Sequence, residues 1–388
     1  MTDARIRTEE ERAIVQWAAT LSDQLSERAK EYDEAGVFVY DQIELLQRAG
    51  YGGLTVPKAY GGKGASLYSF LLAQERLAEG DSSAALVMGW SLGITLSLQD
   101  THAWPDALFE TFCREAVAGR ALVNACGSEP ETGSPSRGGR PTTQAIACDG
   151  GYQITGHKTW ATGSLKLTHI IVTAYIPDLD RVGEFLIRQG APGLMIEETW
   201  DTMSMRGTGS NTLHLNQVFV PAKDALDIIE PGARARRSTD GSGWLLHIPA
   251  TYLGVANAAR RYAIDFAKTY APNSLGKPIA TVPHVRDKIG RIELLRDTAR
   301  TTLYDVAARY DAASDADRPK MRTDLGLAKV VAMNAALEIV DLAMRVVGGQ
   351  SLWKSTPLER YYRDVRAGLH NPPMEDAVMA QLASRALE

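Results

Sequence analysis

Apolar residues in the first third of the chain recur every three or four positions, the spacing of one helical face. Thr8, followed three residues later by Glu11, predicts a capping box at the start of the first helix. Two later segments repeat the spacing and stop before Gly50 and Gly80. The apolar positions are Ile14, Trp17, Ala18, Leu21 and Leu25, then Ile43, Leu45 and Leu46, then Leu67, Phe70, Leu71 and Leu77. Residues 1–118 are therefore expected to form a helical domain.

Near Gly119 the pattern changes to short apolar or alternating runs separated by turn residues. Such runs, rich in β-branched residues, are typical of strands in a compact β domain. They are Tyr152 with Ile154, His169–Ile176, Phe185–Ile187, Leu194–Ile196 and Leu213–Val220. Residues 119–228 are expected to form this domain.

Helical spacing returns after Gly232–Gly243, a Gly/Arg/Ser-rich stretch that we interpret as a linker. Thr323-Asp324 predicts the N-cap of a long helix, and Gly348-Gly349 predicts its end. Residues 229–388 are therefore expected to form a second helical domain. Helices, then strands, then helices predict an α+β fold in which the two kinds of element form separate layers.

The charge balance argues against some classes of partner. The chain has 42 Lys and Arg against 47 Asp and Glu, a net charge of -5, so no nucleic-acid partner is expected. No stretch of about 20 residues is apolar enough to cross a bilayer, so no membrane association is expected. Arg234, Arg236 and Arg237 form a local basic cluster. Either it is a solvated part of the linker, or it anchors a phosphate-bearing ligand.

Cysteine usage bears on metal sites and on the compartment. Cys113, Cys126 and Cys148 are odd in number and contain no C-x-x-C pair, which argues against a disulfide framework or a structural zinc site. No metal site is expected. The first residues are rich in Arg and Glu and lack the apolar core of a signal peptide, so a cytoplasmic location is expected.

The sequence motifs of several common enzyme classes are missing: there is no P-loop, no G-x-G-x-x-G after a strand, no H-E-x-x-H and no G-x-S-x-G. Two other segments could bind a flat redox ring. Residues 126–134, C-G-S-E-P-E-T-G-S, could offer backbone N–H groups and hydroxyls to a ring edge, although an ordinary surface turn has the same composition.

Residues 156–163, G-H-K-T-W-A-T-G, are the second segment. Trp160 and Thr162, two apart on a strand, should point to one face. There the indole could pack against a heterocycle while the hydroxyl bonds a ring nitrogen. The alternative interpretation is an ordinary pair of one core and one surface residue.

At their spacing, the two segments resemble the patterns T-E-P-x-x-G-S and K-x-W-I-T of the acyl-CoA dehydrogenase family. Other landmarks resemble that family in the same order: Gly50–Gly62, Met205–Ser210, Val218–Pro221, Gly348–Gln350 and Tyr362–Asp364. They span residues 50–364. The resemblance implies an N-terminal all-α domain, a small central β-barrel or sandwich and a C-terminal four-helix bundle.

The resemblance also implies a flavin site. Its ring-binding residues would be Cys126, Ser128, Gly133, Ser134, Trp160 and Thr162. Trp160 would stack near the ring, Thr162 would hydrogen-bond N5, and Ser134 would lie between the flavin phosphate and the substrate's CoA portion. Gly348, Gly349 and Gln350 would contact the dinucleotide part of FAD from a neighbouring subunit, which implies a homodimer or homotetramer.

The chain departs from the family where the catalytic base should lie. Typical members place a Glu nine residues after the arginine of R-D, and here that position is Pro372. His370 and Glu375 lie nearby and are the candidates for catalytic groups, although Glu375 could instead be an ordinary acid at a helix N-terminus. A second family position for the base aligns near Trp244; His247, one turn further, is interpreted as a packed core histidine.

The sequence allows alternatives for both the cofactor and the reaction. The family's R-K-T-F-G turn, whose Arg reaches FAD, corresponds to Pro272–Lys277 and has no Arg, so FAD is expected but FMN is an alternative. The first hypothesis is α,β-dehydrogenation of an acyl-CoA or related thioester, with an electron-transfer flavoprotein as reoxidant. The second is a monooxygenase of the same fold, which takes reduced flavin from a separate reductase. The third is a member that has lost its active site.

Overall fold

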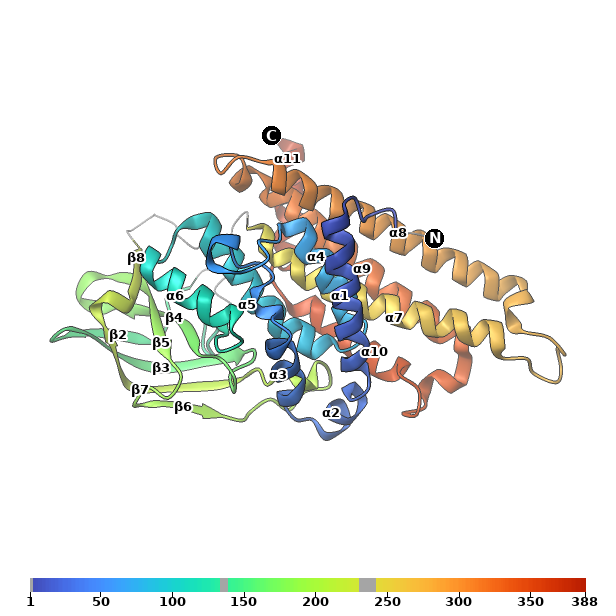
Figure 1. The fold of residues 1–388 in the computed structure, drawn as a ribbon, viewed down its shortest axis with the longest axis horizontal. Coiled ribbons are helices and arrows are strands. Elements are labelled where there is room, and N and C mark those ends of the chain that lie inside the picture. Colours follow the sequence, from blue (N-terminus) through green and yellow to red (C-terminus); the bar gives the residue numbers. More distant parts are fainter. Residues whose placement is uncertain (1–2, 133–138, 230–241) are drawn as a thin grey trace.

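The computed structural model describes residues 3–132, 139–229 and 242–388. Figure 1 shows the strands gathered at one end of the molecule and the long helices α7, α8 and α9 at the other, with the first helices between them. The fold is that of three consecutive parts, helical, β and helical, as the sequence predicts. Gly133, Ser134 and the basic cluster of the linker lie outside the described residues.

The described helices of the first part are α1 Glu9–Ser26, α2 Ala29–Ala35, α3 Tyr40–Arg48, α4 Leu67–Ala78, α5 Ser82–Thr101 and α6 Asp106–Val117. Three of them, α1, α3 and α4, match the three predicted segments. The capping box is confirmed, because the Glu11 amide donates to Thr8 Oγ1 at 3.1 Å and the Thr8 amide donates to Glu11 Oε2 at 3.2 Å. The sequence pattern did not predict α2, α6 or α5, the longest of these three. Sixteen of its twenty residues are buried, and a helix buried all round shows no apolar stripe in its sequence.

The eight described strands form one hydrogen-bonded sheet in the order β6-β7-β3-β2-β4-β5-β8, with β1 parallel to β4. Their bounds are β1 Val123–Cys126, β2 Gln144–Cys148, β3 Gly151–Ala161, β4 His169–Ile176, β5 Arg181–Arg188, β6 Leu194–Glu197, β7 Asn211–Pro221 and β8 Ala225–Ile229. The five predicted apolar runs fall in β3 to β7. The longest pairing joins β3 to β7, and its register shifts between Lys158 and Ala161.

The last part contains α7 His247–Thr269, α8 Pro283–Ala312, α9 Arg322–Val347, α10 Leu358–Ala367 and α11 Glu375–Leu387. The predicted N-cap of α9 is wrong, because the helix begins at Arg322 and Asp324 lies in its first turn. Asp324 instead pairs with Arg309 at 2.7 Å and with Arg385 at 2.8 Å, joining α9 to its two neighbours. The predicted end is confirmed: Gly348 follows the last helical residue with φ 71°.

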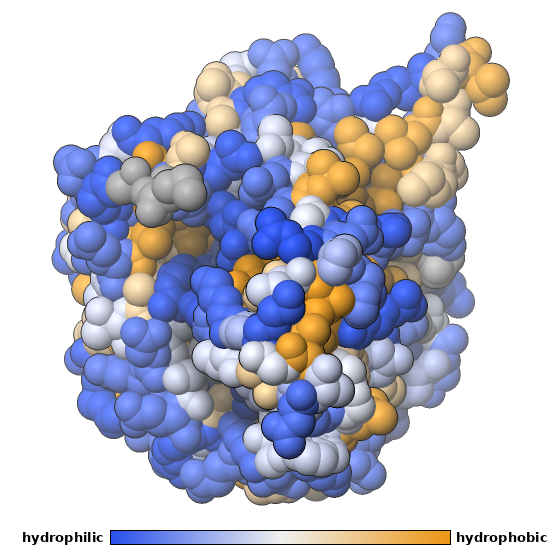
Figure 2. Space-filling view, turned by 90° about the vertical axis from the view of Figure 1, so that its right-hand side faces the viewer, coloured by the Kyte–Doolittle hydropathy of each residue, from blue (hydrophilic) through white to orange (hydrophobic). Residues whose placement is uncertain are grey.

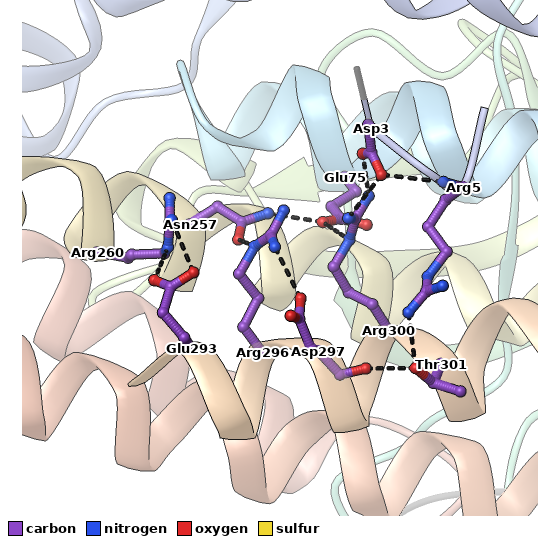
Figure 3. Close-up of polar contacts among 10 residues, drawn as sticks. All are labelled: Asp3, Arg5, Glu75, Asn257, Arg260, Glu293, Arg296, Asp297, Arg300 and Thr301. Atoms are coloured by element: carbon purple, nitrogen blue, oxygen red, sulfur yellow. Dashed lines mark hydrogen bonds and ion pairs between the residues drawn. The ribbon is translucent and has the colours of Figure 1, made fainter. Parts of the chain in front are cut away.

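A buried ion-pair network fastens the start of the chain to the helices (Figure 3). The Arg300 guanidinium on α8 pairs with Glu75 of α4 at 2.8 Å and with Asp3 at 2.7 Å. The Tyr304 hydroxyl donates to the same Glu75 carboxylate. Arg300 and Glu75 are both buried, so each charge depends on the other for compensation.

Candidate flavin-binding site

The strand that carries the predicted ring-binding pair is kinked at Trp160. This residue has φ 59°, and the register of β3 against β7 shifts here, as in a β-bulge. Trp160 is 62% exposed, whereas Thr162, just past the strand, is only 8% exposed. The expectation that the two side chains share one strand face is therefore wrong. An extra residue in a strand reverses the alternation of its faces.

Thr162 opens a chain of buried hydroxyl groups. Its Oγ1 lies 2.9 Å from Ser210 Oγ, which lies 2.8 Å from Thr208 Oγ1. The Asn124 side-chain amide donates to the Thr162 carbonyl at 3.0 Å and fixes the turn. A hydroxyl has one proton and two lone pairs, so this contact leaves Thr162 Oγ1 able to make a further hydrogen bond to a ring nitrogen.

Trp160 presents an open aromatic surface beside this turn. Its ring meets Trp200 edge-on, with centroids 5.2 Å apart, and the Trp200 indole N–H donates to the Met205 carbonyl at 3.0 Å. Trp200 is thus held in place while Trp160 remains exposed. The exposed indole and the hydroxyl with spare bonding capacity fit a flavin ring, and the ring contacts remain a prediction.

The two motif segments are joined by a buried ion pair that the sequence analysis did not single out. Lys158 Nζ of β3 lies 2.6 Å from Glu129 Oε1, and both side chains are 0% exposed. Glu129 also accepts from the Thr142 amide at 2.6 Å and from the Thr143 amide at 3.2 Å. The pair fixes the segment after β1 against β3. The sequence does contain a signal for this ion pair, because Glu129 lies in the first motif segment and Lys158 in the second.

Electrostatics keep this pair ionised. Burial alone would raise the pKa of Glu129, but the Lys158 ammonium and the hydrogen bonds from Thr143 and Thr142 outweigh it and lower the pKa to about 2. The neighbouring Ser128 carbonyl accepts from the Thr159 amide at 2.9 Å. The half-buried Ser128 and the buried Cys126, at the end of β1, are therefore held beside β3.

The predicted dinucleotide segment, Gly348 to Gln350, lies in the turn that ends α9. Both glycines are exposed, and a Cβ added to either would meet no atom within 4 Å. Beyond them, Leu352 is 71% and Trp353 60% exposed. Figure 2, which faces the end of the helical part, shows hydrophobic patches among hydrophilic residues. The backbone of this turn is open to a ligand from outside the protomer.

The candidate catalytic groups, His370 and Glu375, follow α10 in the last helical part. Glu375 begins α11, and its carboxylate accepts from the Asn334 side chain of α9 at 3.4 Å. His370 is exposed, and its neighbour Asn371 accepts from the Tyr252 hydroxyl at 2.9 Å. Within the described ranges, no hydrogen bond or ion pair links His370 or Glu375 to the Trp160 turn. Their catalytic roles remain predictions.

His247 is a packed core histidine, as expected, but only one of its ring nitrogens is hydrogen-bonded to a described residue. It is buried at the start of α7, and its Nδ1 lies 2.8 Å from the Trp244 carbonyl oxygen. Burial lowers its pKa to about 4, so the ring is neutral at pH 7. Its Nε2, however, has no hydrogen-bond partner among the described residues. A satisfied core histidine would bond through both nitrogens.

The R-D landmark joins all three parts of the chain. Arg363 pairs with Asp33 of α2 at 2.5 Å. Asp364 accepts from the Met205 amide at 2.7 Å and from the Ser82 hydroxyl at 2.9 Å. Burial raises the pKa of Asp364 to about 6, against the opposing effects of the Met205 amide, Arg360 and Ser82. The motif therefore has a structural role in this chain.

The raised pKa of Asp364 gives a pH prediction. Between its ordinary value of 3.8 and about 6, the folded chain holds a proton that the unfolded chain has lost, so stability falls as pH rises through this window. Asp364→Asn should remove that dependence, on the order of 2 kcal/mol between pH 4.5 and 7. Urea unfolding at both pH values measures it, with the exposed Asp149→Asn as control. Equal pH dependence in wild type and Asp364→Asn would contradict the assignment.

Family comparisons agree with this geometry. The acyl-CoA dehydrogenase N-terminal domain model matches residues 8–101, the middle domain model residues 124–218 and the C-terminal domain model residues 246–371. The chain belongs to the acyl-CoA dehydrogenase family, a family of flavoprotein oxidoreductases. No helix within the described residues is long and apolar enough to cross a membrane.

Individual relatives include different named activities. The chain is 45% identical to the putative acyl-CoA dehydrogenase YdbM of Bacillus subtilis (strain 168), over 99% of both chains. It is 32% identical to the amino sugar nitrososynthase RubN8 of Streptomyces rubradiris, over 88% of this chain and 81% of that protein. The structure of KijD3 with FMN and an amino-keto dTDP-sugar matches with a TM-score of 0.85 and 25% identity, over 98% and 94% of the chains.

Proposed function

We propose that this protein is a flavin-dependent monooxygenase built on the acyl-CoA dehydrogenase fold. One observation carries the proposal: Pro372 occupies the position at which the family usually has its catalytic carboxylate. The candidate acid nearest to it in sequence, Glu375, is hydrogen-bonded to Asn334 on α9. Removal of an α-proton from a thioester needs a positioned base, whereas a monooxygenase needs none. The likeness to an amino sugar nitrososynthase supports a use of the fold other than thioester dehydrogenation.

The bound flavin would supply the redox chemistry, and the chain's own residues would position it. Trp160 offers an aromatic face, and Thr162 offers a hydroxyl anchored through Ser210. Asn124 and the Glu129–Lys158 pair hold the two segments in register.

Dehydrogenation of an acyl-CoA is the second candidate, and it keeps Glu375 as the base. It is favoured by the 45% identity to a putative acyl-CoA dehydrogenase. Glu375 is only half-buried at the first turn of α11, so a change in the preceding residues could redirect its carboxylate. An electron-transfer flavoprotein would then reoxidise the flavin, whereas a flavin reductase would serve the monooxygenase.

Anaerobic titration separates the two candidates. The flavin-loaded protein is mixed with acyl-CoA thioesters of short, medium and long chain, and the oxidised-flavin absorbance is followed. A monooxygenase should keep its absorbance with every thioester. Supplied with reduced flavin and labelled oxygen, it should transfer one labelled oxygen atom to an organic substrate and release the other as water. Bleaching by any acyl-CoA would contradict the proposal. Loss of that bleaching in Glu375→Gln would then identify the base.

Two turns of the chain bear on whether the flavin is FMN or FAD. The turn at Pro272–Lys277 has no Arg for a second phosphate, which supports FMN. The open Gly348–Gln350 turn supports FAD, bound partly by a neighbouring subunit. Mass analysis of the flavin released by heating distinguishes FMN from FAD.

We expect the surface beside that turn to be a subunit contact, because Leu352 and Trp353 are large, apolar and exposed. Trp353→Asp should place a charge in the contact and shift the protein toward smaller species in sedimentation velocity. Leu387→Asp, at an 87% exposed position near the chain end, is the matched control. An unchanged sedimentation profile for Trp353→Asp would exclude this surface as the contact.

A further inference from the structure

Three hydroxyl groups lead from the flavin turn to a backbone carbonyl, and we call them the hydroxyl chain: Thr162, Ser210 and Thr208. Thr162 Oγ1 lies 2.9 Å from Ser210 Oγ, and Ser210 Oγ lies 2.8 Å from Thr208 Oγ1. Thr208 Oγ1 lies 3.0 Å from the Met205 carbonyl oxygen, where the hydroxyl chain ends. All three residues are buried, so bulk water does not compete for their protons.

The carbonyl end of the hydroxyl chain sets the direction of its hydrogen bonds. A carbonyl oxygen can only accept, so Thr208 donates its one proton to Met205. Ser210 must then donate to Thr208, because Thr208 has no second proton. Thr162 must in turn donate to Ser210. Three protons thus make three hydrogen bonds, and no other assignment of these protons makes all three.

This direction leaves Thr162 Oγ1 able only to accept a further hydrogen bond. Its proton is bound to Ser210, so it can offer a lone pair to a flavin ring but no proton. N5 of an oxidised flavin also carries a lone pair and no proton, whereas N5 of a reduced flavin carries a proton. The hydroxyl chain therefore matches the reduced ring and opposes the oxidised ring.

Reversing the hydroxyl chain costs one hydrogen bond. Thr162 could donate to an oxidised ring only if every proton in the chain turned round, and the contact between Thr208 and Met205 would then lack a proton. The Met205 carbonyl would keep its bonds from the Trp200 indole N–H and the Thr208 amide, both at 3.0 Å. The loss is therefore one neutral hydrogen bond, which corresponds to about a fivefold change in an equilibrium constant.

Backbone contacts hold the oxygens of the hydroxyl chain in place. The Gly163 amide donates to the Thr208 carbonyl at 2.9 Å, which ties the turn after Thr162 to the opposite end of the chain. The Met205 amide donates to the buried Asp364 carboxylate at 2.7 Å, which fixes the residue that supplies the final acceptor. The spacing of the oxygens is therefore set by the fold, and only the protons are left to reorient.

We propose that the hydroxyl chain makes the flavin site selective for reduced flavin, with Thr162 Oγ1 accepting a hydrogen bond from the N5–H group. Ser210 and Thr208 are positioning residues, since they act through Thr162. The inference rests on the proposed function, because it places the flavin ring at the Thr162 turn. It also deepens that function: a monooxygenase takes up flavin that a separate reductase has already reduced, whereas a dehydrogenase must start from bound oxidised flavin.

The reduction potential of the bound flavin tests this inference. The flavin-loaded protein is reduced in equilibrium with a dye of known potential, and the absorbances of dye and flavin give the potential. Ser210→Ala frees the Thr162 proton to turn toward the ring, so the reduced form should lose about fivefold of its advantage. A fivefold change corresponds to a potential lower by about 20 mV for a two-electron couple. Thr208→Val frees the Ser210 proton and should lower the potential by a similar amount.

Further variants separate hydrogen bonding from changes in structure. Thr208→Ser keeps the hydroxyl and should keep the wild-type potential. The double variant Ser210→Ala/Thr208→Val should fall no further than either single variant, because both substitutions break one chain. Ser164→Ala removes a buried hydroxyl that donates to the Gly209 carbonyl at 2.9 Å, outside the hydroxyl chain, and should leave the potential unchanged. An unchanged or higher potential in either Ser210→Ala or Thr208→Val would overturn the inference.

This inference and the proposed function fail on different results. Bleaching of the flavin by an acyl-CoA would refute the monooxygenase, whereas lower potentials in the two variants would still support the hydroxyl chain. Transfer of labelled oxygen, with unchanged potentials in both variants, would instead refute the hydroxyl chain and leave the monooxygenase standing. A protein that binds flavin in neither redox state would refute both.

Discussion

Lys158→Met is expected to lower the free energy of unfolding by about 3–5 kcal/mol, because it leaves the Glu129 carboxylate buried without its counter-ion. The hydrogen bonds from Thr142 and Thr143 remain but cannot replace the ammonium. The same change should lower flavin occupancy, since the segment after β1 is no longer tied to β3. Urea unfolding and the ratio of flavin to protein absorbance after gel filtration measure the two effects.

Two variants control for this result. In Lys158→Met/Glu129→Leu both charges are gone, so much of the lost stability should return, as in other buried pairs replaced by apolar residues. Glu110→Gln breaks an exposed pair with Arg114 and should cost no more than about 1 kcal/mol. If Lys158→Met were as mild as Glu110→Gln, the buried pair would not anchor the two segments.

Arg300→Met is expected to destabilise the protein by a similar amount, about 3–5 kcal/mol, through the network of Figure 3. Glu75 would lose its buried counter-ion, and Asp3 would lose the contact that holds the start of the chain against α8. The unfolding midpoint in urea measures the first effect. Faster hydrogen exchange near the chain start measures the second.

Arg260→Met is the matched comparison, because Arg260 lies in the same view and pairs with Glu293 where both side chains are partly exposed. It should cost at most about 1 kcal/mol. Equal losses for Arg300→Met and Arg260→Met would show that burial does not set the strength of this network.

The sequence predicts much of the fold because its local signals agree with the tertiary structure. The capping box at Thr8 and the apolar run His169–Ile176 both coincide with observed elements. The α5 helix escaped prediction, since burial on all sides removes the amphipathic period. The N-cap at Thr323 failed because Asp324 is held by Arg309 and Arg385, contacts that local propensity does not include.

The candidate site was harder to predict because it depends on backbone detail. The bulge at Trp160 separates two side chains that regular alternation would put together, and the sequence gives no separate signal for a bulge. The Glu129–Lys158 pair joins residues far apart in the chain. The unpaired Nε2 of His247 could not be predicted either, because it depends on which side chains from distant parts of the sequence pack around the ring.

The glycines at positions 89 and 93 of the buried helix α5 have a consequence for comparing homologous chains. Each sits where one added methyl group would collide with Gln74 and His247, or with Trp244. A chain that has alanine or a larger residue at either position must therefore have a smaller or differently placed residue on the facing helix. Substitutions at these sites and on the facing helix should therefore change together across homologues.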